Sequence, residues 1–204
     1  MQLRRQILTL RLACATALAL LVVGCTTQST TSTPPKASAM PTESFSSTDI
    51  AWIQLMIPMA ERAQQLTDLA PSHAASPELA ELAATAGARL HEDQTRLREL
   101  LKLAGVPDSN PHEGHNMPGM VSLPTLEKAG AATGKVFDQI LADALRAHLN
   151  QSTLLCAGER SEGHAGAVKK FAASLARNTT AQVARLNDVS PARSAAPSNA
   201  AAGG

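Results

Sequence analysis

The chain has 204 residues, a formal net charge of +1, and aromatic residues make up only 2% of it. A near-neutral chain without clustered lysine and arginine lacks the positive surface with which proteins bind nucleic acid, and so few aromatic rings cannot form a base-stacking platform. We therefore expect no nucleic-acid partner.

Residues 1–24 have the organisation of a signal peptide. Three arginines precede an apolar run over residues 12–23, and about twelve residues are too few to span a bilayer. The run ends in Val22-Val23-Gly24-Cys25, which resembles the lipobox of bacterial lipoproteins. We expect cleavage before Cys25, lipid attachment to its thiol, and a protein anchored on the extracytoplasmic face of a cell membrane. The alternative is a plain secretory signal with an accidental cysteine.

The remaining chain divides by composition. Residues 25–48 are rich in Thr, Ser and Pro and predict a disordered tether, whereas residues 189–204 are a tail of Pro, Ala, Ser and Gly. Between them, residues 49–188 are sufficient for one folded domain. Because Cys14 leaves with the signal and Cys25 is expected to carry lipid, Cys156 has no partner for an intramolecular disulfide.

The first half of the domain predicts two helices. Over residues 49–69, Trp52, Met56 and Met59 lie on one helical face, which Pro58 should kink. Ser76-Pro77-Glu78 has the pattern of a helix start, and the helix should end near Gly105.

The second half repeats this arrangement. After a short helical lead-in at residues 125–132, helices are expected over residues 134–156 and 163–186. No segment alternates with a period of two, so we predict no strand. The expected core is made of large apolar side chains from the last three long helices: Leu90, Leu97, Phe137, Leu141, Phe171 and Leu175.

The two halves resemble each other in sequence. Asp49 begins a pattern that includes Met56 and Met59, and it aligns with the pattern of Asp138, Leu145 and His148. Two hairpins that each leave an apolar stripe can cover one another, so the sequence predicts an antiparallel four-helix bundle with a long connection. Asp49 and Asp138 are expected to cap their own helices.

Three segments resemble the domain-of-unknown-function 305 family: Met56-Ile57-Pro58, the run from His112 to Met120, and Gly134-Lys135-Val136-Phe137-Asp138. The resemblance covers most of residues 49–186. It implies an exported helical bundle with a ferritin-like fold, which agrees with the pattern of apolar residues. Members of the family have been linked to copper and other metals.

The family pattern places one His-His pair after Met-Ile-Pro and another in the third long helix. Here the first pair is Met59-Ala60 and the second is His148-Leu149, so one of four histidines remains. The glutamine typical of the second helix corresponds to Gln94, and its counterpart in the fourth helix to Thr179.

The connection between the halves offers His112, His115, Met117 and Met120 as metal ligands. Imidazole and thioether groups together suit Cu(I), and the site would form if the loop folds around the ion, with His148 close enough to join. The alternative is a polar connector whose histidines are solvated.

Inside the bundle, a hydrogen bond between His148 and Gln94 would satisfy both polar groups without a ligand. Met56 and Met59 are expected to pack in the core, and Cys156 to be buried. His91 and His164 should lie on the surface.

No enzyme signature is present. The Glu-x-x-His pairs of di-iron bundles, the Gly-x-Ser-x-Gly elbow and phosphate-binding glycine loops are all missing from the sequence. Two hypotheses therefore remain: a membrane-anchored lipoprotein that binds or handles a metal such as copper, and a non-catalytic scaffold or interaction bundle that has lost its ancestral ligands.

Overall fold

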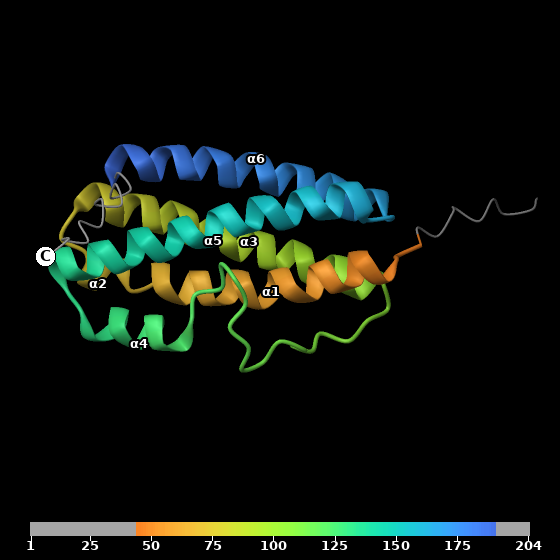
Figure 1. Ribbon diagram of the computed structural model, residues 1–204, viewed down its shortest axis with the longest axis horizontal. Coiled ribbons are helices and arrows are strands. Elements are labelled where there is room, and N and C mark those ends of the chain that lie inside the picture. Colours follow the sequence, from red (N-terminus) through yellow and green to blue (C-terminus); the bar gives the residue numbers. More distant parts are fainter. Residues whose placement is uncertain (1–43, 191–204) are drawn as a thin grey trace, which may run out of the picture. The chain divides into compact units, whose positions relative to one another are not determined.

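A computed structural model describes residues 44–190 as a bundle of four long helices (Figure 1). These are α1 (Ser47–Thr67), α3 (Pro77–Leu103), α5 (Gly134–Glu162) and α6 (Gly166–Val189), and the short helices α2 (Ala70–His73) and α4 (Leu123–Ala131) join them. No strand occurs within residues 44–190. The all-α bundle expected from the sequence is thus confirmed, whereas the signal peptide, Cys25 and most of the tail lie outside the described residues.

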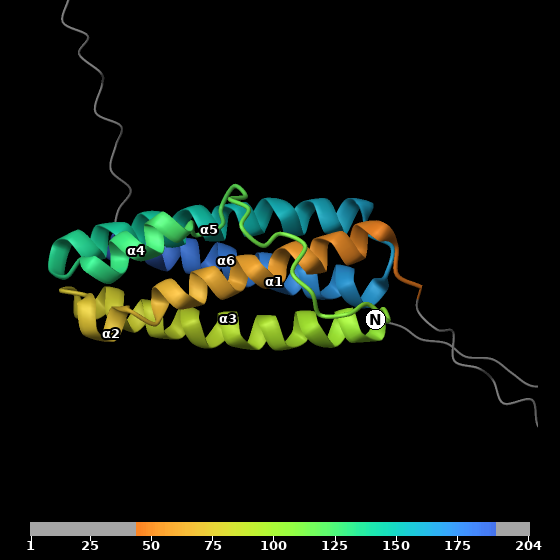
Figure 2. The same ribbon diagram turned by 90° about the horizontal axis from the view of Figure 1, so that it is seen from below.

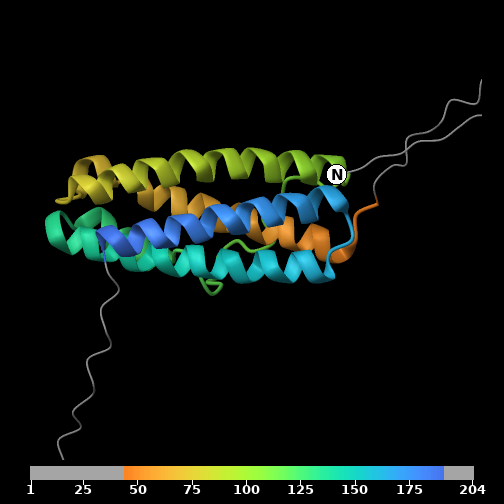
Figure 3. The ribbon, with the colours of Figure 1, turned by 90° about the horizontal axis from the view of Figure 1, so that it is seen from above.

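The helices form two antiparallel hairpins packed side by side. α1 pairs with α3, α5 pairs with α6, and the hairpins meet through α1 with α5 and α3 with α6. Each long helix runs antiparallel to both of its neighbours (Figures 1 and 3). The connection from residue 104 to residue 122 returns along the face made by α1 and α5 (Figure 2). Its residue Val121 accepts a hydrogen bond from Arg62 of α1.

Serine residues begin three of the helices. The Ser46 hydroxyl accepts from the backbone of Asp49, whose side chain accepts in return from Ser46, so α1 starts with a capping box. Ser76 and Ser122 cap α3 and α4, each followed by proline in the first turn, where its missing N–H costs nothing. The cap of α1 explains why this helix starts two residues before the predicted Asp49.

The two aspartates also tie the hairpins to each other. Asp49 accepts from the backbone of His164 at 2.9 Å and of Ala165 at 3.1 Å, immediately before α6. Asp138 accepts from the backbone of Ala75 and Ser76, each at 3.0 Å, immediately before α3. The prediction that each aspartate caps its own helix is therefore wrong for Asp138, whose carboxylate holds the start of the other hairpin's second helix.

The core forms two layers along the bundle. One layer contains Phe137, Leu141 and Leu145 of α5, and the other contains Trp52, Ile53 and Leu97. Five of the six predicted core residues are buried, but Phe171 is only partly buried and packs on the second layer, where it contacts Trp52 edge-to-face. The burial of Cys156 is confirmed.

Two helix ends differ from the prediction. α5 continues six residues beyond Cys156 to Glu162, because Glu159 is still buried against the bundle and keeps this last turn packed. Consequently α6 starts at Gly166 rather than at residue 163.

Candidate functional site

The imidazole of His148 lies inside the bundle with one ring nitrogen unused. The side chain is 2% exposed, and its ring hydrogen-bonds to the backbone of Gly119 in the connection. Nδ1 is buried and makes no hydrogen bond. Burial lowers the pKa of His148 to about 4, although the bond to Gly119 opposes this shift. The ring is therefore neutral near pH 7 and keeps a free lone pair on Nδ1.

Gly119 is the residue that allows the connection to reach His148. Its φ of +75° lies in the left-handed region, and a Cβ added here would stand 2.2 Å from Cβ of Gln151. Only glycine lets the backbone lie this close to α5. The loop thus holds one nitrogen of His148 as a donor and leaves the other as an acceptor, the arrangement typical of metal-binding histidines.

His148 lines a small cavity between all four long helices, with a volume of about 20 Å³. A cavity of this size can hold one water molecule or one ion. Its walls combine apolar residues from every helix with polar groups from three of them: Met56, Ala60, Leu90, Asp93, Leu97, His148, Leu149, Ser152, Leu175, Thr179 and Gln182.

Several polar atoms of this cavity lack hydrogen bonds. Ser152 is 1% exposed and its Oγ has no partner, and Oε1 of Gln182 is also buried without one. Burial, together with the charge of Glu92, raises the pKa of Asp93 to about 6. Thr179, in contrast, is bonded to Thr153 and to the backbone of Ala176. Buried polar atoms without protein partners are rare in folded proteins, so a group of them around one cavity is typical of a ligand-binding site.

The predicted hydrogen bond between His148 and Gln94 is wrong. Gln94 donates to Oε1 of Gln64 at 2.6 Å and accepts from Arg98, so both ends of its amide have other partners. The partner of His148 is instead a backbone group of the connection, which sequence periodicity cannot locate.

The loop residues predicted as ligands divide into two groups. The rings of His112 and His115 lie 6.1 Å apart, with His115 exposed. Met120 is buried in the second core layer, and Met117 packs against that layer. His112 lines a surface groove together with Leu155 of α5. Leu155 follows His148 by seven residues, so the two lie about 10 Å apart along the helix axis. The structure thus brings Gly119 of the loop to His148, places the two methionines on the second core layer and leaves the histidine pair at the surface.

The apolar pattern of the sequence did not point to Asp93 and Gln182, although the sequence carries another signal for them. The pairs Asp49 and Asp138, Ser76 and Ala165, and Asp93 and Gln182 share one constant separation along the chain. Residues with this separation occupy equivalent places in the two hairpins. Asp93 and Gln182 therefore face the cavity as a related pair.

The donors available for a metal are few. Within residues 44–190, no three side chains of His, Cys, Asp or Glu gather closely enough to hold a metal ion. An ion at His148 would need Asp93 and neutral donors, of which the thioether of Met56 and the oxygens of Ser152 and Gln182 line the cavity. The mixture of imidazole and thioether fits copper, while the oxygen atoms fit harder ions.

The fold and this cavity define a class of protein: an antiparallel four-helix bundle with a small polar cavity at its centre. Residues 49–190 match the family described as "Domain of unknown function (DUF305)", and the chain belongs to that family. No helix among residues 44–190 has the length and apolar character needed to cross a membrane.

Three solved structures share the fold. A DUF305 protein of Streptomyces coelicolor that is named as a secreted protein is 16% identical, with a TM-score of 0.63 over 70% of this chain and 91% of that one. A DUF305 fragment from Deinococcus radiodurans is 14% identical, with a TM-score of 0.66 over 72% and 97%. A Bacillus halodurans protein named as a spore coat protein is 12% identical, with a TM-score of 0.56 over 72% and 88%. Among curated protein sequences, none matches this chain.

Proposed function

We propose that this protein is an exported, lipid-anchored bundle that binds one metal ion, Cu(I) in preference to Zn(II), in the cavity at His148. The observation that carries the proposal is the state of that histidine: it is neutral, its donor nitrogen is held by Gly119, and its Nδ1 lone pair is buried without a partner. A metal ion is a Lewis acid and would accept this lone pair.

The other residues of the cavity would complete the site. Met56 offers a thioether, and Asp93 a carboxylate whose charge would offset that of the ion. Cu(I) accepts imidazole and thioether donors, whereas Zn(II) prefers thiolate, imidazole and carboxylate. The cavity offers one imidazole, that of His148, and one carboxylate, that of Asp93, and no thiolate lines it. This favours copper.

Export and anchoring are supported by the N-terminal sequence. The arginines, the apolar run and Gly24-Cys25 occur in the order that lipoprotein processing requires. Cys25 would hold the protein at the extracytoplasmic face of the membrane, and the segment rich in Thr, Ser and Pro that follows it would be a tether to the bundle.

Competition titration with a Cu(I)-specific chromophoric chelator tests the metal site. The full mature chain should bind one Cu(I), and His148→Gln should weaken binding at least tenfold. Glutamine can still donate to Gly119 but lacks the Nδ1 lone pair, so the loop should stay in place. Asp93→Asn provides a second, nearly isosteric change and should also weaken binding. His91→Gln, which removes an exposed histidine, is the matched control. Equal affinity of His148→Gln and the wild type would contradict the proposal.

The loop hypothesis is tested in the same titration. Replacing Met117 and Met120 together by leucine deletes both sulfurs with little change of volume. If the loop thioethers hold Cu(I), this variant loses binding while its helicity is retained. If the cavity holds the ion, its affinity stays within a few-fold of the wild type.

A scaffold function is the alternative. It would be supported if the wild type bound neither Cu(I) nor Zn(II) with an affinity above that of an unfolded control.

A further inference from the structure

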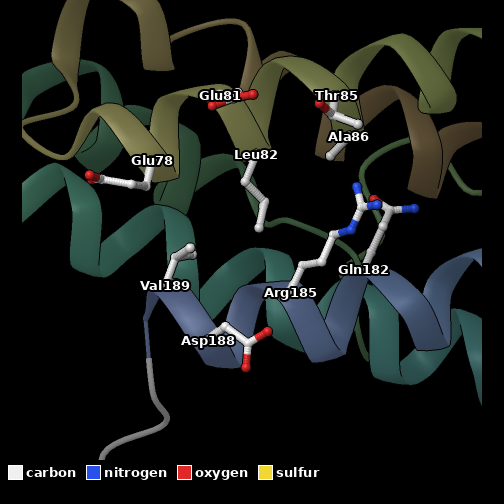
Figure 4. A pocket seen from close by; sticks show the side chains of 9 residues that line it. All are labelled: Glu78, Glu81, Leu82, Thr85, Ala86, Gln182, Arg185, Asp188 and Val189. Atoms are coloured by element: carbon white, nitrogen blue, oxygen red, sulfur yellow. The ribbon is translucent and has the colours of Figure 1, made fainter.

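A groove of about 340 Å³ runs along the surface between α3 and α6 (Figure 4). Its walls come from the first half of α3 and the last half of α6. Thr85 stands on one wall and Arg185 on the other, and Gln182 lies beside Arg185 on α6 (Figure 4).

The groove and the His148 cavity share a wall. Gln182 lines both of them. On α3, Ala86 lines the groove and Leu90, one helical turn further, lines the cavity. Oε1 of Gln182 is buried and makes no hydrogen bond, so no bond at this atom holds the side chain in its present position.

The other three contacts between long helices are either crossed by the connection or more closely packed. The connection from residue 104 to residue 122 crosses the face of α1 and α5 (Figure 2). α1 with α3 and α5 with α6 are the closely packed hairpins. The α3–α6 side is the least closely packed of the four, and its two helices lie side by side with no described segment over them (Figure 3).

The groove carries a negative charge. Glu78, Glu81 and Asp188 line it together with a single cation, Arg185, and all four side chains are exposed. A concave surface with an excess of carboxylates raises the local concentration of cations and their rate of association.

From the shared wall and this charge we propose that the α3–α6 groove is the route by which a metal cation reaches and leaves the His148 cavity, with the Gln182 side chain as its gate. The inference rests on the proposed metal-binding function. Rotation of Gln182 would open the wall, and its amide oxygen could accompany the cation inward.

The experiment separates the rate of binding from its strength. Cu(I) is supplied as a chelator complex, and its transfer to and from the full mature chain is followed by stopped-flow absorbance. Thr85→Trp fills the groove without reaching the cavity. Because a blocked route slows entering and leaving equally, both rate constants should fall at least threefold while their ratio stays unchanged. Thr95→Trp, an exposed threonine on the same helix outside the groove, is the matched control.

Charge removal gives an independent readout. A triple variant, Glu78→Gln with Glu81→Gln and Asp188→Asn, should associate severalfold more slowly at low ionic strength, and the difference should shrink at high salt. The charge-matched control replaces Glu113, Glu127 and Glu162 by glutamine, all of them exposed and outside the groove.

The possible results are distinct. If the wild type binds Cu(I) but Thr85→Trp and Thr95→Trp exchange it at the same rate, the route is overturned and the metal site stands. If the wild type binds no Cu(I), both proposals are overturned.

Discussion

Glu159 is a carboxyl group that the fold keeps protonated. The side chain is 2% exposed, and no hydrogen bond of normal geometry reaches either oxygen. Burial and the neighbouring carboxylate of Asp49 raise its pKa to about 8. Burial also opposes ionisation of Asp49, but hydrogen bonds from Ser46 and from the backbone of His164 outweigh it and lower the pKa of Asp49 to about 2. The proton of this pair therefore resides on Glu159.

Glu159→Gln should remove a pH dependence of stability. The folded pKa of Glu159 lies above its ordinary value of 4.5, so its contribution to stability is complete below about pH 4.5 and is lost as pH rises toward 8. Glutamine is uncharged throughout. The difference in free energy of unfolding between variant and wild type should therefore grow in favour of the variant from about pH 5 to pH 8, as measured by urea denaturation at several pH values.

The difference between variant and wild type excludes the contributions of other titrating groups to the pH dependence, because His148 and Asp93 are present in both proteins. Glu162→Gln, in the same last turn of α5 but exposed, is the control. A difference between Glu159→Gln and wild type that is constant with pH would show that Glu159 is ionised in the folded protein.

At the scale of elements, the start of each hairpin's second helix depends on the other hairpin. Asp49 of α1 accepts backbone hydrogen bonds before α6, and Asp138 of α5 accepts them before α3. Buried or partly buried N–H groups at helix starts need such acceptors. Neither hairpin is therefore complete alone, and the bundle gains cooperativity between its halves.

Core substitutions in α5 and α6 should differ in cost. Phe137 is fully buried, so Phe137→Ala should lower the free energy of unfolding by about 3–5 kcal/mol. Phe171 is only partly buried, so Phe171→Ala should cost about 1–2 kcal/mol. Urea denaturation followed by circular dichroism measures both. A larger loss at Phe171 than at Phe137 would contradict the packing described for the two core layers.

At the scale of the whole molecule, the proposed lipid anchor can be tested separately from the bundle. Cys25 lies outside the described residues, and its role follows from the lipobox pattern alone. Cys25→Ser should abolish labelling by a fatty-acid analogue and move the protein from the membrane fraction to the soluble fraction, because serine cannot form the thioether link to lipid. Cys14→Ser, inside the predicted signal peptide, should leave labelling unchanged. Full labelling of Cys25→Ser would refute the lipobox interpretation.

The sequence by itself determined the helices, their pairing into two similar hairpins and the family. Helix formation and capping depend on residues within a few positions of each other, so their signals are local. Examples are the spacing of apolar residues in α3 and α5 and the Ser-Pro start of α3. Of the site, the sequence identified His148 as a candidate ligand but assigned it the wrong hydrogen-bond partner.

The tertiary structure alone decided what surrounds His148. Asp93, Ser152 and Gln182 come from three helices, and they reach one cavity only when the bundle has assembled. Which nitrogen of His148 stays free depends on Gly119, a loop residue whose backbone approaches α5 without any periodic signal. Periodicity tells which face of a helix is buried, but not which polar atoms on that face find partners, because those partners are set by the packing of distant segments.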